Sequence, residues 1–149
     1  MRIPFFEPRH LSRADEARVV AAIEQAERGH RGEIQVFIEA RYPGDGPVAR
    51  AQALFEELGL GATRDGTGVL LYVAAEDRRV AVWAGPGVHG AAEQGFWKDV
   101  VAEVAAGFAR GDRAGGFERA LERVRALLER AAPGEDRAGD ELANRVIQR

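Results

Sequence analysis

The feature that most constrains the fold is the apolar run GVLLYVA at residues 68–74. A strand with one face in solvent alternates apolar and polar residues, whereas a strand covered on both faces is apolar throughout. The run therefore predicts a central strand with packed layers on both sides. Residues 33–39, EIQVFIE, predict a second covered strand, because apolar side chains occur on both of its faces.

A hairpin is predicted directly after the central strand. Residues 75–78 are a turn of hairpin length, and residues 79–84 alternate as a partner strand should. If the connection between the first two strands is right-handed, those strands run parallel, and the hairpin reverses the third. The predicted sheet is therefore mixed.

Helices are expected around these strands from apolar residues at helical spacing. Ser12 is a suitable N-cap for the first helix, and Pro47 suits the first turn of the second, which ends before Gly59. The four expected helices cover residues 13–28, 47–58, 91–110 and 116–131. This order predicts an α/β fold, a small αβα sandwich with helices on both faces of the sheet.

The length of 149 residues suits one domain, which we place at residues 1–132, followed by a charged tail at 133–149. Leu142, Val146 and Ile147 are the apolar residues with which the tail can pack against the domain.

Composition excludes several classes of function. Basic residues number 21 and acidic residues 24, a net charge of −3, which argues against a nucleic-acid-binding protein. The absence of cysteine removes disulfides, thiolate metal sites and thiol nucleophiles. No apolar run approaches the roughly 20 residues of a membrane helix, and the N-terminus does not resemble a signal peptide. We therefore expect no membrane insertion and a cytoplasmic location.

Common catalytic motifs are missing, including the P-loop, GxSxG and HExxH. The loop at residues 85–90, GPGVHG, lies between a strand and a helix but lacks the GxGxxG spacing of a dinucleotide site. The sequence assigns no catalytic residue. We interpret His10 and His30 as surface or helix-capping residues.

The predicted topology brings two loops together at one end of the sheet. Asp65 precedes the central strand, His89 follows the hairpin, and Glu93 lies just beyond it. Carboxylates suit calcium or magnesium, whereas an imidazole favours transition metals. We predict these three residues as a divalent-metal site. The alternative is structural: a turn at Asp65-Gly66, a favourable charge of Glu93 in the first turn of a helix, and a structural His89.

Several motifs in order resemble the TPM domain family over about residues 12 to 130, and the chain is most similar to its short, stand-alone bacterial branch. The motifs are GEIQV at 32–36, ALFEELG at 53–59, GVLLYV at 68–73, EDRRV at 76–80 and GPGVH at 85–89. The resemblance implies a four-stranded sheet, one strand more than the residue pattern predicts. Either residues 3–6 or the tail can supply that strand.

The family resemblance also implies divalent-metal binding by the loops, and the family carries the label of a phosphatase domain. This chain departs from the family pattern in two places. It has Ala84 where relatives often have an acidic residue, and Gly66-Thr67 where they commonly have Asp-Asn. Fewer carboxylates lower calcium affinity through both ligand count and charge.

The sequence therefore predicts a non-catalytic interaction module that responds to a divalent cation, calcium or magnesium, and contacts a protein partner. One alternative is a weak metal-dependent phosphatase acting on phosphate esters, with Arg64 beside Asp65 as the cation that stabilises phosphoryl charge. Another is a cytoplasmic scaffold that docks through the helix at Phe96-Trp97 or through the tail.

Overall fold

Strand β2 (Gly68–Ala74) lies inside a four-stranded sheet of order β3-β2-β1-β4, and all seven of its residues are buried. The computed structural model describes residues 9–63, 65–134 and 145–149. β2 pairs in parallel with β1 (Glu33–Glu39) and antiparallel with β3 (Arg79–Ala84). The parallel crossover and the hairpin predicted from the sequence are both confirmed.

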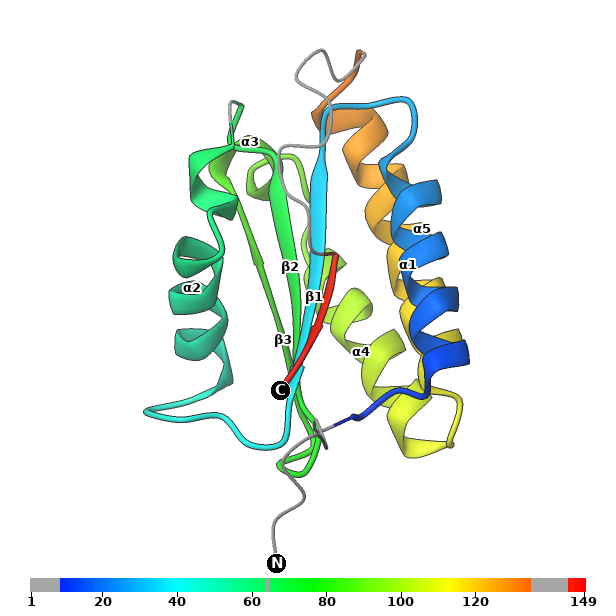
Figure 1. Ribbon diagram of the computed structural model, residues 1–149. Coiled ribbons are helices and arrows are strands. Elements are labelled where there is room, and N and C mark those ends of the chain that lie inside the picture. Colours follow the sequence, from blue (N-terminus) through cyan, green and yellow to red (C-terminus); the bar gives the residue numbers. More distant parts are fainter. Residues whose placement is uncertain (1–8, 64, 135–144) are drawn as a thin grey trace, which may run out of the picture.

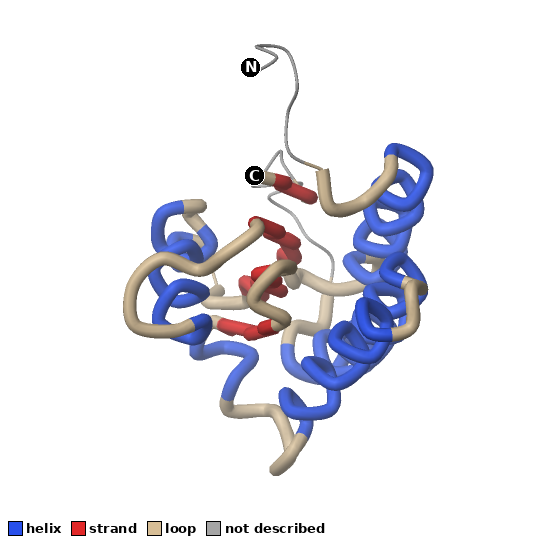
Figure 2. The backbone as a smooth tube through the Cα atoms, turned by 90° about the horizontal axis from the view of Figure 1, so that it is seen from below, coloured by secondary structure: helices blue, strands red, loops and turns tan. Residues whose placement is uncertain are grey.

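Helices cover both faces of the sheet, which confirms the predicted sandwich (Figures 1 and 2). One face carries α2 (Pro47–Glu57). The other carries α1 (Arg13–Glu27), α4 (Phe96–Ala109) and α5 (Arg113–Ala131). Successive side chains of β2 point to opposite faces of the sheet, so the strand contributes to both hydrophobic cores: Leu71 packs with the three-helix layer and Leu70 with α2. Each such side chain, fully buried, contributes about 1.5–3 kcal/mol.

Local signals set the helix ends. The hydroxyl of Ser12 accepts the N–H of Asp15 at 3.1 Å and begins α1 as predicted. His30 is buried and caps the other end of α1. Its Nδ1 accepts the N–H of Gly32 at 3.0 Å, so its proton lies on Nε2, which donates to the carbonyl of Ala26.

Two predicted helix boundaries differ from the structure. Residues 86–89 form a one-turn helix, α3 (Pro86–His89), and α4 begins at Phe96 rather than at residue 91. The delay occurs because Gly95, directly before α4, adopts a left-handed conformation with φ +84°. Helix α5 begins at Arg113 rather than at residue 116, because Asp112 is an N-cap that accepts the N–H of Gly115.

The fourth strand implied by the family resemblance comes from the tail. β4 (Val146–Gln148) pairs in parallel with β1 (Figure 1). The side-chain oxygen of Gln148 accepts the N–H groups of His10 and Leu11, at 2.7 and 2.9 Å, and so joins the strand to the segment before α1. Residues 3–6, the other source considered, and Leu142 lie outside the described residues.

Within the part of the chain that the structure describes, no helix is both long and apolar enough to cross a membrane.

Candidate functional site

The two loops predicted to meet do lie together, at the amino end of β2 near α3 (Figure 1). The N–H of Gly85 donates to the carbonyl of Gly68, and the N–H of Gly87 donates to the carbonyl of Gly66, both at 2.9 Å. A Cβ on Gly87 would lie 2.5 Å from the carbonyl oxygen of Asp65. This close approach of two backbones requires glycine.

The three predicted metal ligands occupy different positions around these loops. Asp65 is exposed, and its Oδ2 lies 2.5 Å from the guanidinium NH1 of Arg31. His89 is the last residue of α3, and Glu93 follows between α3 and α4; both are exposed. The cation partner at Asp65 is an arginine, which the sequence pattern did not indicate. Arg64 lies outside the described residues.

The three side chains are not grouped into a set of metal ligands in the described part of the chain. Among residues 9–63, 65–134 and 145–149, no three His, Asp or Glu side chains are grouped so that they could hold a metal ion. Calcium takes six to eight oxygen ligands, and the carboxylate of Asp65 is already neutralised by Arg31. The assignment of Asp65, His89 and Glu93 to a metal site stays a prediction.

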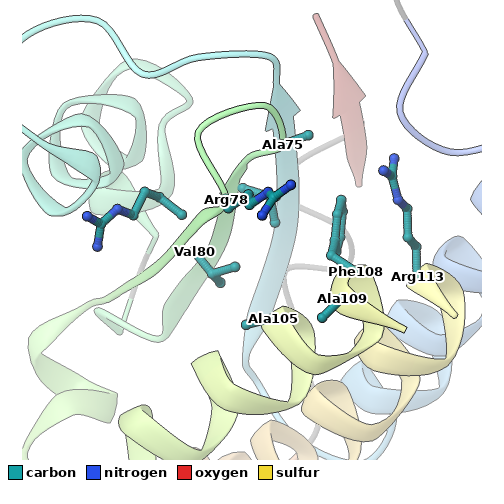
Figure 3. Close-up of a pocket in the computed structure, with 9 residues that line it drawn as sticks. Ala75, Arg78, Val80, Ala105, Phe108, Ala109 and Arg113 are labelled. Carbon is teal, nitrogen blue, oxygen red and sulfur yellow. The ribbon is translucent and has the colours of Figure 1, made fainter. Parts of the chain in front are cut away.

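A pocket of about 390 Å³ lies at the opposite end of the sheet, between the β2–β3 hairpin, α4 and the start of α5 (Figure 3). We call it the arginine pocket. Its lining consists of Val73, Ala75, Arg78, Arg79, Val80, Ala105, Phe108, Ala109 and Arg113. Because β2 ends at Ala74, the pocket lies at the carboxyl end of the parallel strands. Open α/β sheets characteristically bind their ligands at that end.

The guanidinium groups of Arg78 and Arg113 lack acidic partners among the described residues. Arg79 also borders the pocket, but the alternation along β3 places its side chain on the α2 face with Ala81 and Trp83, away from Val80. Arg78 and Arg79 are exposed, and no carboxylate of the described residues forms an ion pair with either of them or with Arg113. The acidic residues of the same hairpin turn are engaged elsewhere. Glu76 pairs with Arg41 at 3.2 Å, and Asp77 accepts the backbone N–H of Tyr42 at 2.9 Å. The pocket therefore carries uncompensated positive charge.

Contacts hold the guanidinium of Arg113 in a defined position, and the backbone of Arg78 has an unusual conformation. The guanidinium of Arg113 lies 4.5 Å from the ring centre of Phe108, and its NH1 donates to the carbonyl of His10 at 2.7 Å. Arg78 has φ +56°, and it is the single non-glycine residue with positive φ in the described ranges. Arg78 is the last residue of the turn between β2 and β3, a position where short hairpin loops commonly place a residue in the left-handed conformation.

No pattern in the sequence indicates the arginine pocket. Its two cations come from segments more than 30 residues apart, so no linear motif unites Arg78 with Arg113. The one local signal is an arginine at the end of a hairpin turn, where glycine, asparagine or aspartate is more usual.

A second polar cluster lies at the same end of the sheet on the α2 face. Arg50 donates to both oxygens of Glu39, at 2.8 and 3.1 Å, and the hydroxyl of Tyr72 donates to Glu39 at 2.5 Å. Burial raises the pKa of the Tyr72 phenol well above its usual value, and the hydrogen bond to Glu39 raises it further. The three groups satisfy one another, which is typical of a structural network.

Solved structures share this fold. The BA42 protein of the psychrophilic bacterium Bizionia argentinensis is 26% identical, with a TM-score of 0.83 over 97% of this chain and 99% of that one. The N-terminal domain of a P. gingivalis protein (22% identity, TM-score 0.66) covers 81% of this chain and 78% of that one. The N-terminal domain of the cg2496 protein of Corynebacterium glutamicum (17%, 0.64) covers 85% and 78%. The last two comparisons show the fold alone.

A comparison with curated proteins gave no match. Residues 7–127 match the sequence profile of the TPM domain, and this range includes both ends of the sheet described above. The match spans most of the chain and agrees with the ordered motifs on the central strand, the hairpin turn and the following loop. The chain therefore belongs to the TPM domain family.

Proposed function

We propose that this protein is a non-catalytic interaction module that binds an anionic group of a partner in the arginine pocket. One observation carries the proposal: Arg78 and Arg113 line a single pocket, and neither is paired with a carboxylate of the described residues. Arginine forms paired, charge-assisted hydrogen bonds with carboxylates and phosphates, and these bonds are stronger than neutral ones.

The composition of the pocket favours binding over chemistry. Its nine lining residues are apolar or arginine, so they include no carboxylate, hydroxyl or imidazole that could act as nucleophile or general base. The guanidinium groups of Arg78 and Arg113 beside apolar side chains can bind an anion and hold it in place. The proposal therefore assigns the pocket to recognition.

Binding of calcium or magnesium at Asp65, His89 and Glu93 is a separate prediction for the other end of the sheet. Hydrolysis of phosphate esters is the alternative function that depends on it. Hydrolysis of p-nitrophenyl phosphate that requires added metal, and that is lost in Asp65→Asn, would establish the alternative and contradict a purely non-catalytic role. We expect no turnover above that of the metal in buffer.

Nuclear magnetic resonance tests the proposed function directly. The ¹⁵N-labelled full chain is titrated at low salt with acetate and with inorganic phosphate, the simplest members of the two anion classes. We expect at least one anion to shift the amide signals of Val80 and Phe108 in the native protein. The shifts should weaken in Arg113→Gln and persist in Arg130→Gln, which removes the same charge from an exposed residue near the end of α5. Shifts confined to other regions would refute the proposal.

A further inference from the structure

The walls of the arginine pocket restrict which anion it suits. Resting on the function proposed above, we infer that its ligand is a carboxylate carried on a small apolar group, and not a phosphate. Three features of the pocket lead to this inference: its apolar lining, the presentation of its guanidinium groups and the occupied N-terminus of α5.

Six of the nine lining residues are apolar, and they come from both sides of the pocket. Val80 belongs to the hairpin, whereas Ala105, Phe108 and Ala109 follow one another along α4 (Figure 3). The volume of about 390 Å³ is near the lower end of the range for ligand pockets, about 300–1,000 Å³. A ligand that fills this space buries an apolar group of few carbon atoms against these walls.

The guanidinium groups lie at the edge of this apolar surface. In Figure 3, Arg78 and Arg113 lie on either side of Phe108. Stacking on Phe108 orients the planar guanidinium of Arg113, and one of its five N–H donors is used by His10. The remaining donors match the two coplanar oxygens of a carboxylate. Arg78 supplies a second cation from the hairpin.

The N-terminus of α5 argues against a phosphate. Phosphates are typically bound by free backbone N–H groups at a helix N-terminus. At α5 the carboxylate of Asp112 takes that role, accepting the N–H of Gly115 at 3.2 Å and lying 3.4 Å from Arg119. A phosphate beside Arg113 would meet this negative charge with up to two charges of its own. A carboxylate carries one charge and meets less repulsion.

The test compares four probes: hexanoate, hexyl phosphate and hexanol, which share a six-carbon chain and differ in charge, and acetate, which has the carboxylate without the chain. Each is titrated into the ¹⁵N-labelled full chain, and the dissociation constant is read from the amide shifts of Val80 and Phe108. We expect hexanoate to bind at least about tenfold more tightly than acetate, the factor given by burial of two methylene groups. We expect hexyl phosphate and hexanol to bind more weakly than hexanoate.

The other outcomes distinguish failure of the carboxylate preference, of the apolar component and of the proposed anion site. Tighter or equal binding of hexyl phosphate would overturn the carboxylate inference and leave the proposed anion site standing. Equal binding of hexanol and hexanoate would overturn both, because charge would then play no part. Equal binding of acetate and hexanoate would overturn the apolar component. A complete lack of shifts at the pocket with every anion would refute the proposed function itself.

Variants and peptides complete the experiment. Arg78→Gln and Arg113→Gln should each weaken hexanoate binding about tenfold or more, and Arg130→Gln should leave it unchanged. The side chain of Arg78 is exposed and forms no hydrogen bond or ion pair within the described residues, so its variant tests the site even if Arg113→Gln disturbs the segment at His10. A short peptide ending in leucine, with a free or an amidated C-terminus, identifies the source. Tighter binding of the free-ended peptide than of hexanoate indicates a partner's chain end, and weaker binding indicates a free acid.

Discussion

The crossing of α4 and α5 depends on two glycines that face each other, and it offers a sharp test of the packing. A Cβ added to Gly107 would lie 2.7 Å from both the Cα of Gly116 and the carbonyl oxygen of Asp112. Both are backbone atoms, so no side-chain rotation relieves the contact. Gly107→Ala must move one helix relative to the other.

Two opposing effects determine how much Gly107→Ala changes the free energy of unfolding. Alanine in a helix is favoured over glycine by about 1 kcal/mol, so Gly107→Ala would be stabilising if space allowed. Overpacking of a tight core typically costs about 1–3 kcal/mol, and backbone contacts place this site in the upper part of that range. The net expectation is a destabilisation of about 1–2 kcal/mol. For a domain of this size that lowers the melting temperature by about 2–8 °C.

Urea and thermal unfolding followed by circular dichroism measure the effect. Gly90→Ala is the matched control, because a Cβ there meets no atom within 4 Å and the φ of −69° suits alanine. The control should be neutral or slightly stabilising. An unchanged or raised melting temperature for Gly107→Ala would refute the argument that the two helices are in backbone contact at this position.

Three further predictions follow from the electrostatics. Burial lowers the pKa of His30 below its ordinary value of 6.5, so the unfolded chain binds the proton more readily than the folded protein. The free energy of unfolding, measured by urea titration, should therefore fall as the pH drops below about 6.5, and it should fall less steeply in His30→Gln. Because the pKa of the Tyr72 phenol is raised in the folded protein, the free energy of unfolding should fall as the pH rises above about 10. In Tyr42→Phe, Tyr72 is the one remaining tyrosine, and its tyrosinate absorbance should appear well above that pH. Absorbance that appears near pH 10 would contradict the network of Tyr72 with Glu39. Calorimetry should show tighter calcium binding in Arg31→Gln than in the native protein and none in Asp65→Asn, whereas equal affinity in all three would show that the ion pair is not involved.

The core of the fold could be predicted because its signals are local and periodic. The apolar run of β2 identifies a strand covered on both faces, and the short turn after it indicates a hairpin. The N-cap at Ser12 and the proline at residue 47 mark two helix starts correctly. Each of these features depends on neighbours within a few residues.

The elements that differed depend on distant contacts or on backbone conformation. β4 has three residues, too few to show a period, and its position comes from pairing with β1 and from the contacts of Gln148 with His10 and Leu11. The later start of α4 depends on the left-handed conformation of Gly95. Propensity alone does not reveal whether a given glycine adopts that conformation.

At the predicted metal site too, the position of the loops could be predicted but the pairing of the side chains could not. Topology correctly placed the loops at Asp65 and His89 beside each other, because parallel strands fix which loops share an end of the sheet. It could not indicate that Arg31 takes the carboxylate of Asp65 as its partner. Side-chain pairing across elements depends on rotamers and exact distances, which a strand and helix pattern does not contain.

The two ends of the sheet differ in a way that bears on where this protein acts. At the amino end, backbone hydrogen bonds between Gly85 and Gly68 and between Gly87 and Gly66 join the loops directly, and the nearby carboxylate of Asp65 is paired. At the carboxyl end, the hairpin leaves a pocket whose cations lack acidic partners among the described residues. The exposed guanidinium of Arg78 is hydrated in the free protein, so it is available to a ligand that brings a negative charge into the pocket. The proposed anion site therefore lies at the open end of the sheet, opposite the end where the loops are joined by backbone hydrogen bonds.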